Sequence, residues 1–288
     1  MYNIIINAST DKGQKAVKKI SKILDKRGAE YKFHFTSYPK HAKEIAYELA
    51  ESGEKNIIGV GGDGTFHEII NGVQNLSGVN LGFVAYGSGN DFAKAAGLPV
   101  NNLKKAFEII LNGKTKKIDY LQFKNGLRCL NAAGMGMDVE VLSKAYAWRR
   151  LKGWPNYLWA VIRVLKTFEG YNFTVEFDGE KKTYDCMMMC LSNGIYIGGG
   201  MKVSPNSVID DGKLNLVVIK IVDRKLYKRL LPKFLTGKHI GLFADEYLVE
   251  NVKITSNAPL KAQLDGEIYP DFEFNCRIVK SGINMFCM

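Results

Sequence analysis

The sequence predicts an α/β protein in two parts, a doubly wound parallel-sheet domain over residues 1–117 and an antiparallel β-sandwich domain over residues 118–288. Up to residue 117, short apolar runs alternate with amphipathic stretches, which is typical of repeated β-α units. Beyond residue 117, strand-like runs dominate and Asp-Gly turns separate them, as in antiparallel sheets. The sequence leaves open whether the last residues return to the first domain.

The first domain is expected to begin with an apolar strand and to continue as β-α repeats. Near-continuous apolar runs predict strands that are buried on both faces, at residues 2–7, 31–35, 56–60 and 81–85. Apolar residues at helical spacing predict helices at residues 12–27, 40–52, 65–75 and 102–111. Ligands of such sheets bind beyond the carboxyl ends of the strands. The loops that follow the four strands are therefore the expected ligand site.

The second domain is expected to consist mostly of β-strands. They are predicted at residues 118–123, 127–132, 172–177, 183–192, 213–222, 251–256 and 273–279. Turns are marked by three Asp-Gly pairs, Asp178-Gly179, Asp211-Gly212 and Asp265-Gly266. Helical spacing is confined to residues 141–168 and 224–242.

Charge is the one skewed feature of the composition. Lys and Arg number 40 against 29 Asp and Glu, which gives a net charge of +11. This excess favours an acidic partner: nucleic acid, an anionic membrane surface or a phosphorylated ligand. No apolar stretch approaches the roughly 20 residues of a transmembrane helix, and the five cysteines form no CxxC pair. These features predict a cytoplasmic protein.

A glycine turn with the sequence VGGDGT, residues 60–65, joins the third predicted strand to its helix. Glycines there let backbone N–H groups approach a phosphate, and the helix N-terminus adds the positive end of its dipole. The turn fits neither GxGxxG nor GxxxxGK[ST]. A carboxylate beside a phosphate needs a cation between them, so Asp63 suggests Mg²⁺. The alternative is an ordinary turn in which Asp63 caps the helix that follows.

A second glycine loop with the sequence AYGSGNDF, residues 85–92, follows the next strand and carries Asp91. Loops that follow neighbouring parallel strands lie at the same edge of a sheet. Two carboxylates beside one phosphate site are the arrangement that metal-assisted phosphoryl transfer requires. The two loops together therefore indicate phosphoryl transfer.

Five motifs occur in order along the chain. They are GGDGTFHEIINGV at residues 61–73, GSGNDFAKAAGLP at 87–99, NAAGMGMD at 131–138, SNG at 192–194 with GGG at 198–200, Pro205 and DDG at 210–212, and LDGE at 264–267. Together they resemble the bacterial diacylglycerol kinase-like lipid kinases, relatives of the sphingosine and ceramide kinases. The resemblance implies a first domain like those of NAD kinase and phosphofructokinase that binds the nucleotide, and a β-sandwich that takes the lipid.

The resemblance also implies roles for individual residues. Glu267 would be the general base for the lipid hydroxyl, and Asp63 and Asp91 would organise a catalytic Mg²⁺. Binding of ATP would fall to Asn7, Ala8, Ser9, Thr10, Asp11, Thr36, Gly62, Asp63, Gly64, Thr65, Phe66, His67, Glu68 and Ser88. A separate structural Mg²⁺ site would be formed by Val208, Asp211 and Lys213.

Two features depart from the family or have a simpler explanation. The first-strand turn usually reads NPxSG in this family, but here it reads NASTD at residues 7–11, and the glycine is displaced to Gly13. Without the resemblance, residues 265–267 would be read as an ordinary hairpin turn. His67 lies on the helix after the glycine turn, where it approaches the nucleotide or is simply packed.

The positive charge is concentrated in two segments of the second domain. Residues 141–170 hold six basic residues, one acid and all three tryptophans, and residues 224–240 hold six basic residues and no acid. In the second segment Leu226, Leu230 and Phe234 have helical spacing. Basic helices with Trp, Phe and Leu on the other face match interfacial membrane binding. The alternative is that the aromatic residues pack at a domain interface and the charges are solvated.

The sequence therefore predicts an ATP-dependent lipid kinase that binds the inner face of the membrane peripherally and converts diacylglycerol to phosphatidic acid. No nucleic-acid partner is expected, because no known binding motif accompanies the basic residues. An NAD kinase, which shares the GGDGT turn, and a catalytically silent lipid- or nucleotide-binding protein are the alternatives. The lipid headgroup, the acyl chains and the choice between a monomer and a homodimer stay open.

Overall fold

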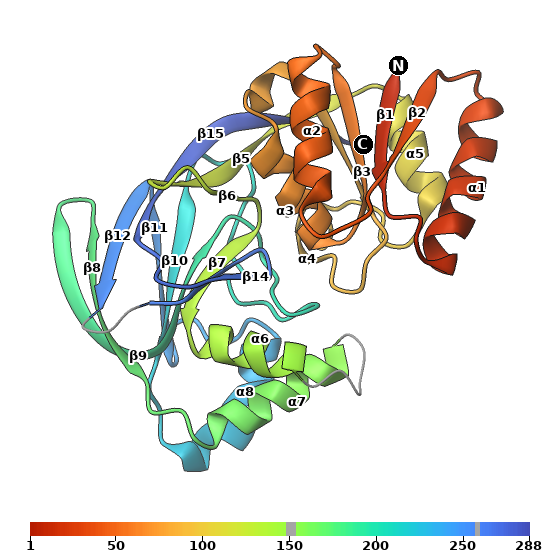
Figure 1. Ribbon diagram of the computed structural model, residues 1–288. Helices are drawn as coiled ribbons and strands as arrows, with labels where there is room; N and C mark the ends of the chain where they lie inside the picture. The colour runs from red at the N-terminus through yellow and green to blue at the C-terminus, as the bar shows by residue number, and fades with distance from the viewer. Residues whose placement is uncertain (148–153, 257–259) are drawn as a thin grey trace. The chain divides into compact units, whose positions relative to one another are not determined.

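The computed structural model describes residues 1–147, 154–256 and 260–288, and it divides into two compact units. Unit 1 comprises Met1–Asp119 and Lys280–Met288, and unit 2 comprises Tyr120–Val279 (Figure 1). The end of the chain thus belongs to the first unit. Within the first basic segment, Trp148, Arg149, Arg150 and Lys152 lie outside the described residues.

Unit 1 contains a parallel sheet. Its strands are β1 (Tyr2–Ile6), β2 (Tyr31–Phe35), β3 (Asn56–Gly61) and β4 (Asn80–Ala85), in the order β2-β1-β3-β4. The end of β15 (Phe274–Phe286) adds a parallel strand beside β4, with Asn284 opposite Asn80. The central strands are apolar and fully buried at positions such as Ile4 and Ile58. This burial explains their near-continuous apolar runs.

Helices cover both faces of this sheet (Figure 1). Helices α1 (Asp11–Asp25) and α5 (Leu103–Leu111) pack together on one face, and α2 (His41–Glu51) and α3 (Asp63–Gly72) pack together on the other. Helix α1 buries Ala16, Ile20 and Leu24, which are spaced four residues apart and form its apolar stripe. A 3₁₀ turn, Leu76–Gly78, and a five-residue helix, α4 (Asp91–Ala95), complete the unit. The predicted doubly wound architecture is confirmed.

Unit 2 is built from antiparallel strands around an apolar core. They are the second part of β5 (Thr115–Phe123), β6 (Arg128–Cys129), β7 (Ala132–Gly136), β8 (Tyr171–Phe177), β9 (Glu180–Ser192), β10 (Leu214–Lys220), β11 (Ala244–Val249), β12 (Asn251–Ser256), β13 (Ala262–Leu264) and β14 (Glu267–Tyr269), together with the first part of β15. Strand β9 is long enough to pair first with β8 and then with both β7 and β10. The predicted antiparallel sandwich is confirmed.

Three helices cover the other face of β9 and β10. They are α6 (Met137–Ala147), α7 (Trp154–Leu165) and α8 (Tyr227–Leu235), and a 3₁₀ turn at Arg224–Leu226 precedes α8. Met189 and Leu191 of β9 face the core between the strands, whereas Met188 and Cys190 face these helices. Because both faces are covered, the run CMMMCL is apolar throughout. Burial raises the pKa of the Cys186 and Cys190 thiols to about 12, so these thiols are inert.

Several predicted boundaries in unit 2 were wrong. The single strand expected at residues 127–132 is interrupted between β6 and β7. The helix expected at 141–168 is two helices, and the one expected at 224–242 ends at Leu235, before Gly237 with its positive φ. The short strands β13 and β14 were not predicted. In the described part of the chain, no helix is both long enough and apolar enough to cross a membrane.

Candidate functional site

The two glycine loops of unit 1 lie side by side. Strands β3 and β4 are neighbours with Gly61 opposite Ala85, and the Tyr86 N–H donates to the Gly61 carbonyl at 2.7 Å. A Cβ atom on Gly87 would lie 2.5 Å from the Cα atom of Gly62. The loops therefore touch backbone to backbone, and a side chain at Gly87 would force them apart.

Asp63 links the two loops. It is the first residue of α3, and the helix N-cap is Gly62, which makes no side-chain cap. The Asp63 carboxylate instead accepts hydrogen bonds from the backbone N–H groups of Asp91 and Phe92, each at 3.2 Å. It thus caps α4 in the second loop. The alternative in which Asp63 caps its own helix was therefore wrong.

The carboxylates of Asp63 and Asp91 face the same space beside Gly89. A Cβ atom on Gly89 would lie 3.0 Å from Asp63 Oδ2 and 3.9 Å from Asp91 Oδ2. The ammonium group of Lys94 lies 3.3 Å from Asp91 Oδ1. No group of three or more His, Cys, Asp or Glu residues that could hold a metal occurs among the described residues. Two carboxylates nevertheless fit Mg²⁺, because this ion commonly takes its remaining ligands from water and substrate phosphates.

The turn after β1 approaches the second glycine loop through Lys12. Ser9 donates to Asn7 Oδ1 through both its N–H and its hydroxyl, at 2.9 and 2.6 Å. The Lys12 ammonium donates to the Tyr86 carbonyl at 2.7 Å and lies 4.2 Å from the centre of the Tyr86 ring. A Cβ atom on Gly13 would overlap the Asn7 carbonyl oxygen, which explains the displaced glycine. Lys12 was not among the residues expected at the nucleotide, although it directly follows the implied range 7–11.

Five more of the implied nucleotide residues fall into two groups. Thr36 lies at the same edge of the sheet, because its N–H donates to the Ile6 carbonyl at 3.1 Å, and Ser88 is exposed in the second loop. In contrast, the side chains of Phe66 and His67 are only 1% and 3% exposed. The Glu68 carboxylate accepts from the N–H groups of Lys40 and Ala42 and so caps α2. The side chains of Phe66 and His67 are thus buried within unit 1, and that of Glu68 is hydrogen-bonded there.

In unit 2, Glu267 follows a tight turn. Strands β13 and β14 form a hairpin in which Leu264 is opposite Glu267, and both turn residues, Asp265 and Gly266, have positive φ. The hairpin expected from Asp-Gly alone is thus present. Glu267 itself is exposed.

Asp265 holds this hairpin in place. Its carboxylate accepts hydrogen bonds from the N–H groups of Leu130, Asn131 and Ala132, at 2.8–3.3 Å. Because these three N–H groups bind one carboxylate, the chain between β6 and β7 does not follow regular strand pairing. The interruption of the predicted strand 127–132 therefore has a cause 133 or more residues away along the chain.

The SNG motif at residues 192–194 and the NAAGMGMD motif at residues 131–138 meet next to Asp265. Asn131 accepts at its carbonyl from the N–H groups of Asn193 and Gly194, and the Asn193 side chain donates to the Leu130 carbonyl. Asp138 is the second residue of helix α6 and is 3% exposed. Burial raises the pKa of its carboxyl to about 7, against hydrogen bonds from Gln263 and the Val139 N–H that lower it.

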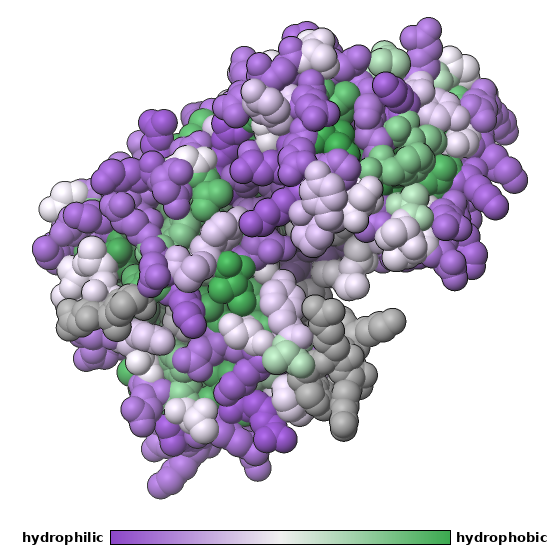
Figure 2. Space-filling model, viewed as in Figure 1, coloured by the Kyte–Doolittle hydropathy of each residue, from purple (hydrophilic) through white to green (hydrophobic). Residues whose placement is uncertain are grey.

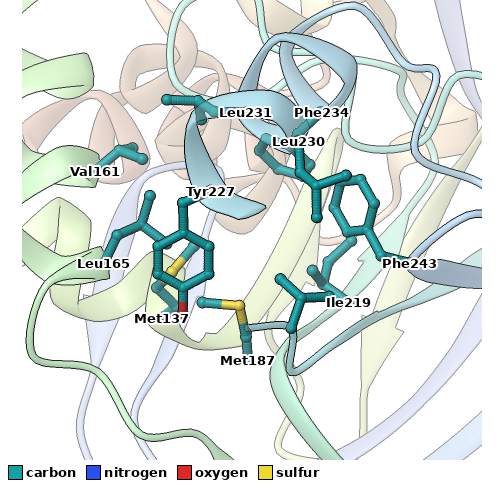
Figure 3. A pocket seen from close by; sticks show the side chains of 11 residues that line it. Met137, Val161, Leu165, Met187, Ile219, Tyr227, Leu230, Leu231, Phe234 and Phe243 are labelled. Atoms are coloured by element: carbon teal, nitrogen blue, oxygen red, sulfur yellow. The ribbon is translucent and has the colours of Figure 1, made fainter. Parts of the chain in front are cut away.

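Unit 2 also contains an apolar pocket, formed by side chains of α6, α7, α8 and the neighbouring strands (Figure 3). It has a volume of about 40 Å³ and is lined by Met137, Val161, Leu165, Met187, Ile219, Val222, Tyr227, Leu230, Leu231, Phe234 and Phe243. Leu230, which is half-buried, and Phe234, which is 7% exposed, thus line the pocket. Of the three residues with helical spacing in this segment, Leu226 is exposed, at 43%.

The implied structural metal site lies in the loop before β10. Asp211 Oδ1 accepts from the Lys213 N–H at 2.9 Å, and Val208 is exposed. The Lys213 ammonium pairs with Glu250 at 2.7 Å. A cation here would depend on Asp211 Oδ2 and on backbone carbonyl oxygens, a donor set that suits a hard cation.

Comparisons with known proteins cover both units. The model of the diacylglycerol kinase catalytic domain matches residues 2–123, and that of the YegS C-terminal NAD kinase beta sandwich-like domain matches residues 131–287. The diacylglycerol kinase of Bacillus subtilis (strain 168) is 29% identical over 277 residues, which span 92% of this chain and 88% of the relative. That of Mycobacterium tuberculosis (strain ATCC 25618 / H37Rv) is 28% identical over 243 residues, which span 82% of this chain and 75% of the relative. The crystal structure of a diacylglycerol kinase from Bacillus anthracis str. Sterne matches with a TM-score of 0.76 at 22% identity, over 100% of this chain and 96% of that one, and this likeness shows the fold.

Proposed function

Because the chain belongs to the diacylglycerol kinase-like lipid kinases, we propose that it transfers the γ-phosphoryl group of ATP to the hydroxyl of diacylglycerol and so forms phosphatidic acid. The observation that carries this proposal is the pair of carboxylates, Asp63 and Asp91, that face one space between two glycine loops. Phosphoryl transfer depends mainly on positioning the reactants and on stabilising charge, and the two glycine loops with their carboxylates would supply both.

The residues of unit 1 have distinct tasks in this reaction. Backbone N–H groups at the start of α3 and the ammonium of Lys12 would bind the phosphates. Asp63 and Asp91 would hold Mg²⁺, which neutralises the charge on the phosphate oxygens when bound. The two glycine loops are already joined through Asp63, so the site needs little reorganisation to receive the nucleotide.

Glu267 of unit 2 would act on the lipid. As the lipid oxygen forms its bond to the γ-phosphorus, the bond from that phosphorus to the β–γ bridging oxygen breaks and ADP leaves. The proton of the lipid hydroxyl passes to the Glu267 carboxylate. The hairpin that carries Glu267 is anchored through Asp265 and suits this task, because a base must be held within hydrogen-bond reach of the proton it takes.

The apolar pocket of unit 2 would hold part of an acyl chain (Figure 3). Its lining offers many apolar side chains and few polar groups, which favours a hydrocarbon over a soluble dinucleotide. A volume of about 40 Å³ accommodates little of a chain. We therefore expect Met137 and Met187 to move on binding, because methionine side chains adapt readily.

Replacing Leu230 with glutamine is expected to raise the apparent KM for long-chain diacylglycerol about tenfold, because burial of a leucine contributes roughly 1.5–3 kcal/mol. The KM for ATP should stay unchanged. Kinetics in mixed micelles measure both values, and Leu242→Gln, at a leucine that is 60% exposed, is the matched control. An unchanged lipid KM in Leu230→Gln would rule out the pocket as the acyl-chain site.

Peripheral binding to an anionic membrane would rest on charge. Residues 224–240 expose Arg224, Lys225, Lys228, Arg229 and Lys238, whereas the apolar side of α8 faces the pocket. On the face shown in Figure 2, hydrophobic residues occur in small groups among hydrophilic ones. Cations near an anionic surface contribute about 1 kcal/mol each.

Replacing Lys225 and Lys228 together with glutamine is expected to weaken binding to phosphatidylserine vesicles by about 2 kcal/mol, or roughly 30-fold. Co-sedimentation at low and high salt measures this change. The control pair is Lys15→Gln with Lys18→Gln, at exposed positions on α1. Equal loss in both pairs would show that net charge alone, not this segment, governs binding.

The lipid substrate is tested directly with pure protein, labelled ATP and Mg²⁺. Mixed micelles of diacylglycerol and other lipid alcohols are offered in one reaction and NAD in another, because the second matched domain is described as NAD kinase-like. We expect label in phosphatidic acid. Label in NAD would establish the second candidate, an NAD kinase, and label in another lipid would replace diacylglycerol as the substrate.

A further inference from the structure

A chain of hydrogen bonds connects helix α6 to the N–H group of Gly266, the residue before Glu267. The Gly266 N–H donates to Gln263 Oε1 at 2.9 Å, and Gln263 Nε2 donates to Asp138 Oδ2 at 3.2 Å. Gly266 is a donor and Asp138 an acceptor, so both contacts require the same orientation of the Gln263 amide. Gln263 thus connects the N-terminal end of α6 to the turn.

The same helix reaches the turn a second time. The Tyr146 hydroxyl donates to the Gly266 carbonyl at 2.6 Å. Tyr146 is near the end of α6, two turns beyond Asp138. Gly266 is therefore bound through both of its peptide groups, the one shared with Asp265 through Gln263 and the one shared with Glu267 by Tyr146.

Asp138 is itself held in place. Its Oδ1 accepts from the Val139 N–H at 2.9 Å, and a Cβ atom on Gly134 would overlap its Oδ2. Any side chain at Gly134 would displace the carboxylate. Both Asp138 and Gln263 are at least 94% buried, where a hydrogen bond cannot be exchanged for one to water without cost.

We propose that Asp138, Gln263 and Tyr146 are positioning residues that fix the two peptide groups of Gly266 and thereby the direction in which Glu267 leaves the turn. This inference rests on the proposed function of Glu267 as the general base. Asp138 acts through Gln263, so its task is separate from contact with the substrate. A two-residue turn can still rotate its central peptide group. The hydrogen bonds from α6 restrict this rotation, which the pairing of the two hairpin strands alone does not.

The test exchanges donor and acceptor between the two buried side chains. In Asp138→Asn, an amide NH₂ replaces one carboxylate oxygen and so faces either the Val139 N–H or the Gln263 NH₂. In Gln263→Glu, two carboxyl groups face each other. Each single variant is expected to lower kcat 10- to 100-fold at an unchanged KM for ATP. In the double variant, the asparagine amide donates to the new glutamate, which still accepts from Gly266, so kcat should recover to within about threefold of wild type.

Hydrogen–deuterium exchange and two further variants keep the outcome specific. Hydrogen–deuterium exchange of the peptide containing residues 264–268 should be faster in both single variants and normal in the double variant. Asn215→Asp is the control, because Asn215 is 1% exposed and donates to Glu246 at 3.1 Å in the same unit. It places a buried carboxylate beside the partly buried carboxylate of Glu246, away from the turn, so kcat should stay near the wild-type value. Tyr146→Phe should give a smaller loss than either buried variant.

The proposal is overturned if the single variants keep the wild-type kcat, if the double variant is no better than the singles, or if Asn215→Asp loses as much activity. A wild-type rate in Glu267→Gln would instead refute the base assignment. Exchange at residues 264–268 reports the network without any turnover, so these two failures are distinguishable. Faster exchange with full activity would show that the turn is held but does not position a catalytic group.

Discussion

Replacing Asp63 with alanine is expected to lower kcat about 10³-fold, which corresponds to about 4 kcal/mol of transition-state stabilisation. The Asp63 carboxylate faces the space shared with Asp91 and also caps helix α4 in the second glycine loop. Its loss would remove a proposed Mg²⁺ ligand and release the contact that joins the loops. Steady-state phosphorylation of diacylglycerol with labelled ATP measures the effect.

The cap and the charge of Asp63 are separable. Asp63→Asn keeps one oxygen that can accept from α4 but loses the negative charge, so it should be nearly as inactive as Asp63→Ala. Asn102 caps α5 by accepting from the Lys105 N–H, and Asn102→Ala should lose about 1 kcal/mol of stability with little change in kcat. If Asp63→Asn retained most activity, Asp63 would be a structural cap and not a metal ligand.

Replacing Glu267 with glutamine is expected to lower kcat 10²- to 10⁴-fold, the range that a general base contributes. Glutamine preserves the size of the side chain but cannot take the proton of the lipid hydroxyl. Because Glu267 is exposed and follows the turn, the substitution should leave the melting temperature and the KM for ATP unchanged. Initial rates, a thermal melt and ATP titration measure these three quantities.

Glu273 provides the matched control for Glu267. It is an exposed acid of the same unit that pairs with Lys124 at 3.4 Å. Glu273→Gln should retain wild-type kinetics, because an exposed pair contributes little. A Glu267→Gln enzyme with more than about one tenth of the wild-type kcat would contradict the assignment, since a general base contributes at least 10²-fold.

The local patterns of the first 117 residues predicted unit 1 closely. The range 31–35 matches β2, and the helix predicted at 40–52 is α2 with one residue fewer at each end. Helix α2 buries one face, so its hydrophobic periodicity is enough to reveal it. Strand β2 lies at the edge of the sheet and none of its residues is fully buried, so the expectation that this strand is buried on both faces was wrong. The two glycine loops were predicted on the same grounds, because they directly follow such strands.

Unit 2 was less predictable, because its elements depend on distant residues. Strand pairing is interrupted between β6 and β7, where the Asp265 carboxylate accepts hydrogen bonds from three backbone N–H groups. No local feature of residues 127–132 predicts this interruption. The hairpin of β13 and β14 has strands of three residues, too short for a periodic pattern. The basic segment at residues 224–240 was expected to present Leu230 and Phe234 to a membrane, but these side chains line the pocket.

The sequence alone determined the order of the elements, the two glycine loops and the acids that follow strands, since each of these is encoded by residues close together in the chain. Only the tertiary structure decided which groups those acids bind. Asp63 caps a helix that begins 28 residues later, and Asp138 meets Gln263 across 125 residues. Such contacts depend on how the strands pair, and sheet pairing joins residues that no local pattern connects.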